Sequence, residues 1–252
     1  MYRLRVTGGL LNDNGSGVRN DGNLTMTDCT ITGNEAADAG GGVFTTTTLS
    51  FTRCKVIENK AANGGGIYVS GAAATVTLAG TVIGQNQASV HGGGVYVNSG
   101  TLRVEDGSQI TANSAGTGGG LRSSGTVLLA PNSSVTGNDA WDGAGIFNAA
   151  GGNLSLQAGS RVTGNKAGQN GGGIYSAGTG SQTYLSTSCR IEGNTANSNG
   201  GGIYAGGGTM VTLSTGALVC DNSSPQCVAA VAGTLIGPGS CPNPAGGVCP
   251  AS

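Results

Sequence analysis

Short segments in which every second residue is apolar recur along the whole chain. Residues 67–69, 76–78 and 81–83 form one set of three, with the sequences Ile-Tyr-Val, Val-Thr-Leu and Thr-Val-Ile. Alternation with period two places neighbouring side chains on opposite faces of an extended strand, so these segments predict strands and not helices. None of them could bury its apolar face alone, so each is expected to pair with copies of itself.

A longer repeat carries these strands. Each unit has an Ile or Val three residues before an asparagine, an alanine two residues after it in seven consecutive units, and then a Gly-Gly-Gly-apolar element. The spacing of about 26 residues lies within the range of solenoid repeats. The asparagines are Asn34, Asn59, Asn86, Asn113, Asn138, Asn165, Asn194 and Asn222.

Stacking the units pairs each strand with its copies in the units before and after it. The pattern therefore predicts an all-β fold over residues 1–224, a right-handed parallel β-helix with three short strands per coil and about eight to nine coils of ~26 residues. The glycine triplet is lost after Asn222. Residues 225–252 are expected to form a degenerate last coil and a Cys- and Pro-containing C-terminal cap or tail.

Each position of the unit that recurs along the chain predicts a column of side chains. The asparagines are expected to adopt the left-handed conformation at a bend and to hydrogen-bond to one another as a ladder. The glycines are expected to permit positive φ and close backbone approach. Small residues two positions before the Ile or Val are expected at a crowded interior edge; they are Cys29, Cys54, Thr81, Ser108, Ser133, Ser160 and Cys189.

A column of large side chains follows the glycines and is expected to point outward. It contains Phe44, Tyr68, Tyr96, Phe147, Tyr175 and Tyr204, together with Arg19 and Arg122. Two interpretations stay open. The column is either an exposed binding strip for sugar rings or partner surfaces, or an aromatic stack that stabilises and shields the sheet. Trp141 is expected in a turn, as a contact tip or as a packed residue.

The units resemble those of right-handed β-helix proteins of the pectate-lyase-like superfamily. They are particularly similar to polymorphic outer membrane protein and autotransporter-adhesin repeats, which pair a Gly-Gly-Ala-Ile element with a Phe-x-x-Asn element. Here Gly-Gly-Gly-Ile/Val/Leu and Ile/Val-x-x-Asn stand in these places, so the aromatic residue is replaced throughout. The resemblance covers residues 4 to about 224 and implies an extracellular or cell-surface protein.

Composition and charge reduce the number of protein classes, partners and sites that fit this sequence. Glycine supplies 51 of 252 residues, charged residues are 9% and the net charge is −1, so a helical enzyme and a nucleic-acid partner are not expected. No apolar run reaches the ~18–20 residues of a membrane span. His91 is expected as a solvated turn residue, and Asp139 and Asp142 are expected to share a turn. Asp13, Asp38 and Asn63 are expected in one turn column, as solvated residues or a weak Ca²⁺ site. No catalytic, metal or cofactor site is predicted.

Three functions compete. The leading hypothesis is a non-enzymatic extracellular structural or adhesive protein, whose partners are copies of itself or other surface proteins and glycans. Leu4 and Val6 already occupy third-strand positions with no cap before them, as expected either of a truncated chain or of a surface that stacks on another subunit to form a filament. The alternative is a carbohydrate-active enzyme (a polysaccharide lyase or glycoside hydrolase) or a glycan-binding module on the same fold. Ice binding would need a flat threonine face; the threonines Thr7, Thr32, Thr111, Thr136 and Thr163 share a column that Ile57, Gly84 and Glu192 interrupt.

Cysteines and glycosylation sequences complete the candidate sites. The possible disulfide cysteines are Cys29, Cys54, Cys220, Cys227, Cys241 and Cys249. The last four are expected to staple the cap, with a connectivity that sequence does not determine. Cys29 and Cys54, one coil apart, either bridge or remain buried thiols. The sequons predict possible glycosylation at Asn23, Asn132, Asn153 and Asn222.

Overall fold

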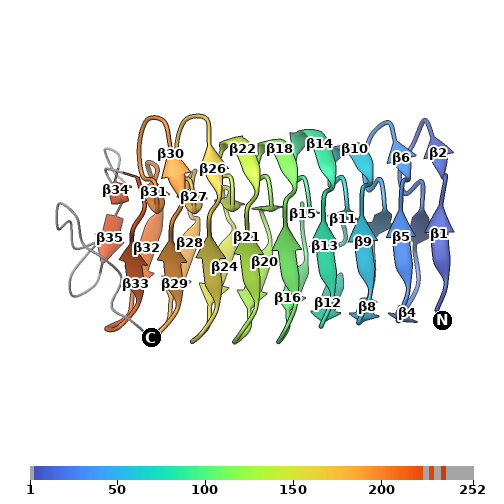
Figure 1. Cartoon of the computed structure of the whole chain (residues 1–252), viewed down its shortest axis with the longest axis horizontal. Coiled ribbons are helices and arrows are strands. Elements are labelled where there is room, and N and C mark those ends of the chain that lie inside the picture. The colour runs from blue at the N-terminus through green and yellow to red at the C-terminus, as the bar shows by residue number, and fades with distance from the viewer. Residues whose placement is uncertain (1–2, 224–226, 230–233, 237–252) are drawn as a thin grey trace.

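The protein is a long parallel β-solenoid, seen in a computed structural model that describes residues 3–223, 227–229 and 234–236 (Figure 1). The strands stack along the rod axis into four sheets. Neighbouring strands are parallel and in register, so that each coil lies directly on the next. The predicted parallel β-helix is confirmed. None of the described residues belongs to a helix long and apolar enough to span a membrane.

Each sheet takes one strand from each coil and is named here by its first strand. The β1 sheet contains β1 (Arg5–Thr7), β5 (Thr30–Thr32), β9 (Lys55–Ile57), β13 (Val82–Gly84), β17 (Gln109–Thr111), β21 (Ser134–Thr136), β25 (Arg161–Thr163), β29 (Arg190–Glu192) and β33 (Leu218–Cys220). The β2 sheet contains β2 (Leu10–Leu11), β6 (Glu35–Ala36), β10 (Lys60–Asn63), β14 (Gln87–His91), β18 (Ser114–Thr117), β22 (Asp139–Asp142), β26 (Lys166–Ala167) and β30 (Thr195–Ala196).

The other two sheets follow in each coil. The β3 sheet contains β3 (Val18–Asn20), β7 (Val43–Thr45), β11 (Ile67–Val69), β15 (Val95–Val97), β19 (Leu121–Ser123), β23 (Ile146–Asn148), β27 (Ile174–Ser176), β31 (Ile203–Ala205) and β34 (Cys227–Ala229). The β4 sheet contains β4 (Leu24–Thr27), β8 (Leu49–Thr52), β12 (Thr75–Ala79), β16 (Thr101–Val104), β20 (Thr126–Leu129), β24 (Asn153–Leu156), β28 (Gln182–Leu185), β32 (Met210–Leu213) and β35 (Thr234–Ile236).

The prediction of three strands per coil is wrong, because the segment after each asparagine is a fourth strand. These β2-sheet strands are short, and from β6 to β30 each has an inward alanine directly after a polar residue, as Ala61 follows Lys60. Such a segment lacks the apolar alternation that marks a half-buried strand in sequence. It is extended because its backbone pairs with the coils on both sides, as Ala61 does with Ala88.

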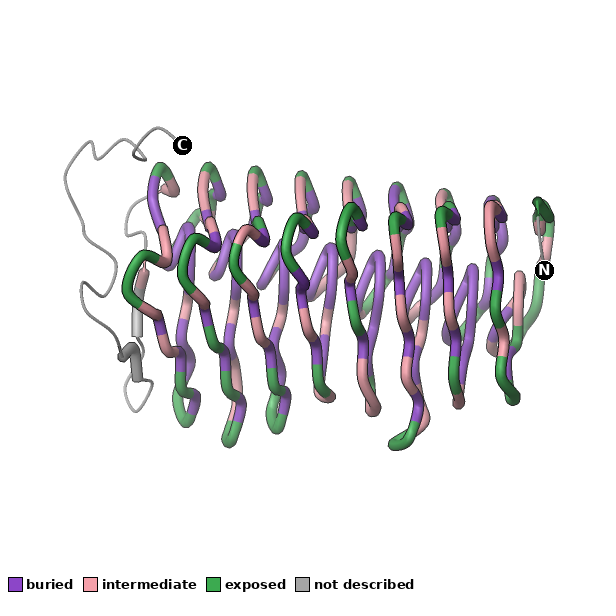
Figure 2. The backbone as a smooth tube through the Cα atoms, turned by 90° about the horizontal axis from the view of Figure 1, so that it is seen from below, coloured by how far each residue is buried: buried purple, intermediate pink, exposed green. Residues whose placement is uncertain are grey.

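One continuous apolar core runs along the inside of the rod. Columns of Ile, Val and Leu from the β1, β3 and β4 sheets, such as Ile83, Val95 and Leu102, are completely buried. Figure 2 shows this burial repeating in each coil, with the exposed positions on the outside of the bends. The inward alanines of the β2 sheet fill the narrower side, where Ala140, Ala144 and Ala167 form a small cluster of their own.

The asparagines form a buried ladder along the rod. The side-chain amide of Asn86 donates to the Oδ1 atom of Asn113 at 3.0 Å, and the backbone N–H of Asn86 donates to the same oxygen at 2.9 Å. The second amide hydrogen of Asn86 reaches the carbonyl of Val56 in the preceding coil at 2.9 Å. The same pattern repeats from Asn34 to Asn222. Each amide therefore satisfies its own polar atoms and a backbone group of a neighbouring coil.

The expected left-handed conformation falls on the residue before each asparagine. Glu58, Gln85 and Ala112 have φ values of 58°, 56° and 54°, whereas the asparagines that follow them are not among the residues of positive φ. The reason is that the residue at the bend must turn the chain, while the asparagine must keep its amide directed along the axis.

The glycine triplet is required by this ladder. At Gly92 the backbone has a φ of 63°, which glycine adopts without strain. Gly94 lies against the next coil, and a Cβ atom there would lie 2.9 Å from the Asn113 amide nitrogen and 2.6 Å from the Gly120 carbonyl oxygen. A side chain at the third glycine would therefore push the coils apart at the ladder.

Four members of the column of small residues, Cys29, Cys54, Thr81 and Ser108, form a second buried ladder. The hydroxyl of Thr81 accepts a hydrogen bond from the backbone N–H of Cys54 at 3.2 Å, and the hydroxyl of Ser108 accepts one from the N–H of Thr81. Cys29 and Cys54 occupy the same column as thiols, and the N–H of Cys29 lies 3.4 Å from the Cys54 sulfur. Burial raises the pKa of Cys189, another thiol of this column, to about 12.

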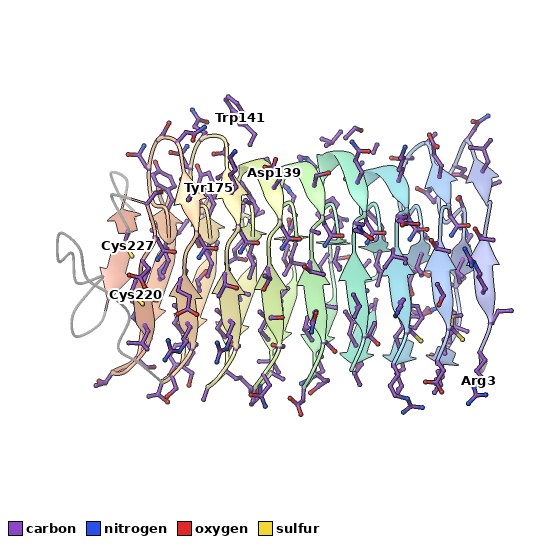
Figure 3. All side chains as sticks on the ribbon, viewed as in Figure 1. Arg3, Asp139, Trp141, Tyr175, Cys220 and Cys227 are labelled. Atoms are coloured by element: carbon purple, nitrogen blue, oxygen red, sulfur yellow. The ribbon has the colours of Figure 1, made fainter. Side chains whose placement is uncertain are left out.

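The C-terminal part continues two of the sheets. Strands β34 and β35 pair with β31 and β32. Cys220 and Cys227 are disulfide-bonded and lie at this end of the rod (Figure 3). The predicted disulfide candidates Cys241 and Cys249 lie outside the described residues.

Removing one asparagine of the ladder should destabilise the whole rod. Asn113→Ala leaves two buried donors of Asn86 without an acceptor, at a cost of about 1–3 kcal/mol each. We expect the free energy of unfolding, measured by urea denaturation, to fall by about 2–4 kcal/mol. The control is Asn197→Ala, at an exposed position, which should change it by less than ~0.5 kcal/mol. Equal effects of the two substitutions would contradict the role of the ladder.

Candidate functional site

The outward column of the β3 sheet is a continuous strip along the rod. Register places Phe44 beside Tyr68, Tyr68 beside Tyr96, and Tyr96 beside Arg122. The strip continues through Phe147 and Tyr175 to Tyr204 and begins at Arg19. It is named here the aromatic strip. Adjacent strands in a sheet lie about 4.8 Å apart, so each ring is within contact distance of the next.

The aromatic strip is less open than an exposed binding strip requires. Phe44 and Tyr96 are only 8% and 9% exposed, and the other rings are half-buried. The ring centroids of neighbouring members lie between 4.8 and 5.5 Å apart. Phe44 and Tyr68 are stacked face to face, and the other pairs are edge-to-face or tilted, so each ring is partly covered by its neighbours. This geometry favours the second interpretation, a stack that stabilises and shields the sheet.

Arg122 interrupts the aromatic strip as a cation between two rings. Its guanidinium carbon lies 5.2 Å from the ring centroid of Tyr96 and 5.2 Å from that of Phe147. The Nε and Nη1 atoms are buried and have no hydrogen-bond partner. Attraction to the two ring faces therefore holds the charge in place of hydrogen bonds. A buried polar group without a partner is unusual and costs stability.

His91 lies beside the aromatic strip, and its prediction as a solvated turn residue is wrong. It ends strand β14 and is half-buried, with its ring edge-on to Tyr96 at a centroid distance of 5.7 Å. Its Nδ1 atom is 2.9 Å from the hydroxyl oxygen of Thr117. Burial lowers the pKa of His91, and the positive charge of Arg122 lowers it further. His91 is thus a neutral packing residue at pH 7.

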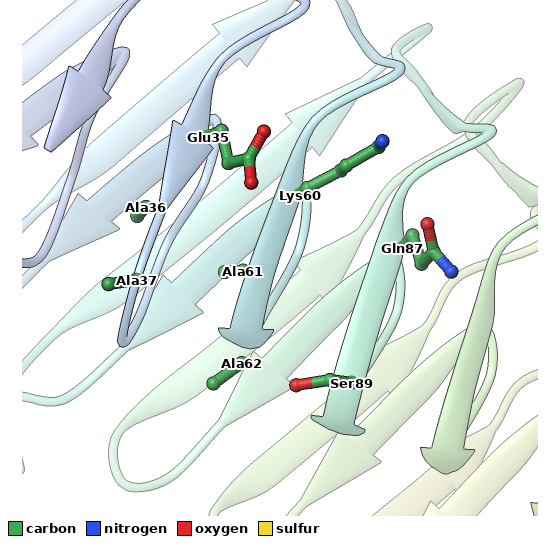
Figure 4. A pocket seen from close by; sticks show the side chains of 8 residues that line it. All are labelled: Glu35, Ala36, Ala37, Lys60, Ala61, Ala62, Gln87 and Ser89. Atoms are coloured by element: carbon green, nitrogen blue, oxygen red, sulfur yellow. The ribbon is translucent and has the colours of Figure 1, made fainter. Parts of the chain in front are cut away.

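The outer face of the β2 sheet carries a shallow groove. It has a volume of about 330 Å³ and crosses strands β6, β10 and β14 (Figure 4). Its lining is Glu35, Ala36, Ala37, Lys60, Ala61, Ala62, Gln87 and Ser89. The alanines make a smooth floor, and the three long polar side chains line one side of it. Sequence reasoning missed this groove because the β2 sheet itself was not predicted.

Trp141 lies on the same outer face, in strand β22 and not in a turn as predicted. It is 62% exposed and projects from the edge of the rod (Figure 3). A Cβ atom added at Gly168 would lie 2.8 Å from the indole Cε3 atom, so the ring lies directly over this glycine in the next coil. Asp139 is on the same strand and pairs in register with Lys166. Both of these side chains are exposed.

The carboxylates lie apart from one another. Asp139 and Asp142 are at opposite ends of β22 and do not share a turn, and Asp142 accepts two hydrogen bonds from Asn170. Among the described residues, no group of three His, Cys, Asp or Glu side chains could hold a metal ion. Asn63 is not in register with Asp38, as the expected column of Asp13, Asp38 and Asn63 requires, because it pairs with Ala39.

The asparagines of the glycosylation sequences and the column of threonines also have defined positions in the structure. Asn23, Asn132 and Asn153 are exposed, whereas the side chain of Asn222 donates to the carbonyl of Ile191 and accepts from Asn194, so that it is part of the asparagine ladder. The threonine column lies on the β1 sheet and is interrupted where expected, with Thr32 beside Ile57 and Thr163 beside Glu192.

Comparison with known proteins finds one match. Residues 188–206 match the Chlamydia polymorphic membrane protein (Chlamydia_PMP) repeat. This segment contains Ile191 and Asn194 of one element and Gly200 to Ile203 of the other, the two elements that recur in most coils. No curated protein and no solved structure gives a significant match. The chain is a β-helix repeat protein that resembles the repeats of polymorphic membrane proteins and autotransporters.

Two substitutions of Arg122 should show whether the aromatic strip is stabilised by the packing of this side chain or by its charge. Arg122→Ala removes two cation–π contacts and their packing, and we expect a loss of about 1–2 kcal/mol in the free energy of unfolding. Arg122→Phe removes the unpartnered N–H groups and continues the stack, so it should stay within ~1 kcal/mol of the parent protein. Urea denaturation measures both. A Phe variant as unstable as the Ala variant would show that the guanidinium itself is required.

The pKa of His91, the single histidine of the chain, reports on the burial and the positive charge beside the aromatic strip. We expect NMR titration to give a pKa for His91 below the usual ~6.5, and Arg122→Gln to raise it. Because the unfolded chain binds this proton more tightly than the folded chain, His91 contributes stability above pH ~6.5 that is lost as the pH falls toward its folded pKa. A pKa at or above 6.5, or no response to Arg122→Gln, would contradict the described packing.

Proposed function

We propose that the protein is a non-enzymatic rod displayed at a cell surface, where it acts in a structural or adhesive role. The observation that carries this proposal is the match of residues 188–206 to a repeat of surface membrane proteins, in a chain whose other coils share the same two elements. The repeat suggests an autotransporter-like surface protein. The adhesive role and the partners, whether copies of the chain or other surface proteins and glycans, are part of the proposal.

Inward residues hold the coils together, and outward residues vary from coil to coil; this difference supports a role in display. The inward columns and the asparagine ladder hold the coils together, and they use only part of each repeat. Outward side chains of the β2 sheet differ from coil to coil, as Glu35, Lys60 and Gln87 do at one position. A rod of this kind can change its surface without changing its core, which suits recognition of partners.

Two paired carboxyl groups of the described surface, Asp21 and Asp28, are unsuited to be the general acid of a glycosidase. Asp21 and Asp28 are paired with Arg19 and Arg53 at 2.8 Å, and hydrogen bonds to these arginines lower the pKa of each carboxyl group. A glycosidase needs one carboxyl group whose pKa is raised, so that it can donate a proton near neutral pH. Arginine partners act in the opposite direction.

The test has two parts. Surface display is tested in the organism that produces the protein, where an antibody against the rod should label intact cells. Adhesion is tested with beads coated with the rod, which should attach to a panel of cell types at least fivefold more than albumin-coated beads do. The protein should also release no reducing ends and no unsaturated uronates from a panel of polysaccharides. Labelling only after cell lysis would contradict surface display, and released sugars would revive the lyase or hydrolase alternative.

A further inference from the structure

We propose that Trp141 is a stacking platform for a neutral glycan chain on the outer face of the β2 sheet. The proposal deepens the proposed function, on which it rests, by naming a ligand class and a site. The starting observation is that the one tryptophan of the chain is 62% exposed on a strand of the β2 sheet, whereas the rings of the aromatic strip on the β3 sheet are buried or half-buried. Burial of a tryptophan ring is a large source of stability that the folded chain leaves unused here.

The backbone beneath Trp141 holds the ring in a defined position. The N–H of Gly168 donates to the carbonyl of Ala140 at 2.8 Å, and the N–H of Gln169 donates to the carbonyl of Trp141 at 2.7 Å. The next coil is therefore bonded directly to the strand that carries the indole. Because Gly168 has no side chain, the ring approaches this backbone closely and presents its other surface to solvent. A preformed aromatic surface loses little conformational entropy on binding.

The surroundings of the ring fit a sugar better than a protein. Asp139 and Lys166 lie side by side in one column, two positions before that of Trp141, and neither side chain makes a hydrogen bond or ion pair in the described part of the chain. Ser114, which pairs with Asp139, adds a hydroxyl group. A protein interface usually has a cluster of apolar residues at its centre. The other exposed large apolar residues on the described strands of this sheet are Leu10, Leu11 and Val90, and none of them is on β18 or β26, the strands next to β22. A pyranose ring combines a C–H face that packs on the electron-rich face of an indole with hydroxyl groups that pair with such polar neighbours.

The balance of charge selects a neutral ligand. Asp139 and Lys166 carry opposite charges at the same position of adjacent coils. A polyanion would meet Asp139, and a polycation would meet Lys166, so neither gains net attraction. The groove formed around Glu35 and Lys60 on the same face has the same mixture of charges. A neutral chain that lies along the rod axis can use hydroxyl and acetamido groups against both signs of charge.

Fluorescence tests the proposal directly, because Trp141 is the only tryptophan. The folded protein is titrated with cellohexaose and chitohexaose as neutral probes, and with hexamers of galacturonic acid and glucosamine as charged probes. We expect at least one neutral probe to shift the Trp141 emission to the blue and to lower acrylamide quenching at least threefold. No response to either neutral probe, or a stronger response to a charged one, would overturn the proposal.

Three variants test whether binding of the hexasaccharide depends on Trp141 or on another exposed aromatic residue. Trp141→Ala should weaken binding of the responding hexasaccharide at least tenfold by calorimetry, and Gly168→Ala should weaken it by displacing the ring. The matched control is Tyr184→Ala, an exposed aromatic residue on the β4 sheet, which should leave binding unchanged. Binding that survives Trp141→Ala would refute the site. Cleavage of the hexasaccharide would instead refute the non-enzymatic function, and loss of surface labelling would refute display; neither result would concern the platform.

Discussion

The requirement that every buried asparagine amide be satisfied by the coil before and the coil after it governs this structure. Asn113 accepts from Asn86 and donates to Asn138 and to the carbonyl of Ile83, so its amide has partners in both directions. Such an arrangement is satisfied only when successive coils have the same height and register. The ladder thereby imposes one geometry on all coils, and the parallel sheets follow from it.

Other recurring residues can be understood as conditions for that ladder. The third glycine of the triplet gives the amide room, and the small residues of the Thr81 column bond the backbone where a larger side chain would separate the coils. Parallel sheets usually have both faces covered. Here the inner faces share one core, and the outer face of the β3 sheet is covered by its own stacked rings.

Function is left to positions that the ladder does not constrain. The β2 sheet contributes only small alanines to the interior, so its outer side chains vary from charged residues around the groove to the indole of Trp141. The regular spacing of the aromatic strip in the sequence fits either binding or packing. In the structure its rings lie against one another and are buried or half-buried, whereas Trp141 on the β2 sheet is accessible.

The repeat in the sequence determined the fold, because a side chain such as Asn86 or Ile83 needs the same neighbour above and below it, and only a solenoid supplies this at every repeat. It also determined which positions face inward, since alternation fixes the two sides of a strand. Only the tertiary structure decided which outward residues are accessible. Tyr96 and Trp141 both point outward, but Tyr96 is covered by His91 and Arg122 from adjacent positions, whereas Trp141 has only Gly168 beneath it. Local sequence could not show this, nor the fourth strand of each coil, because both depend on contacts between residues one coil apart.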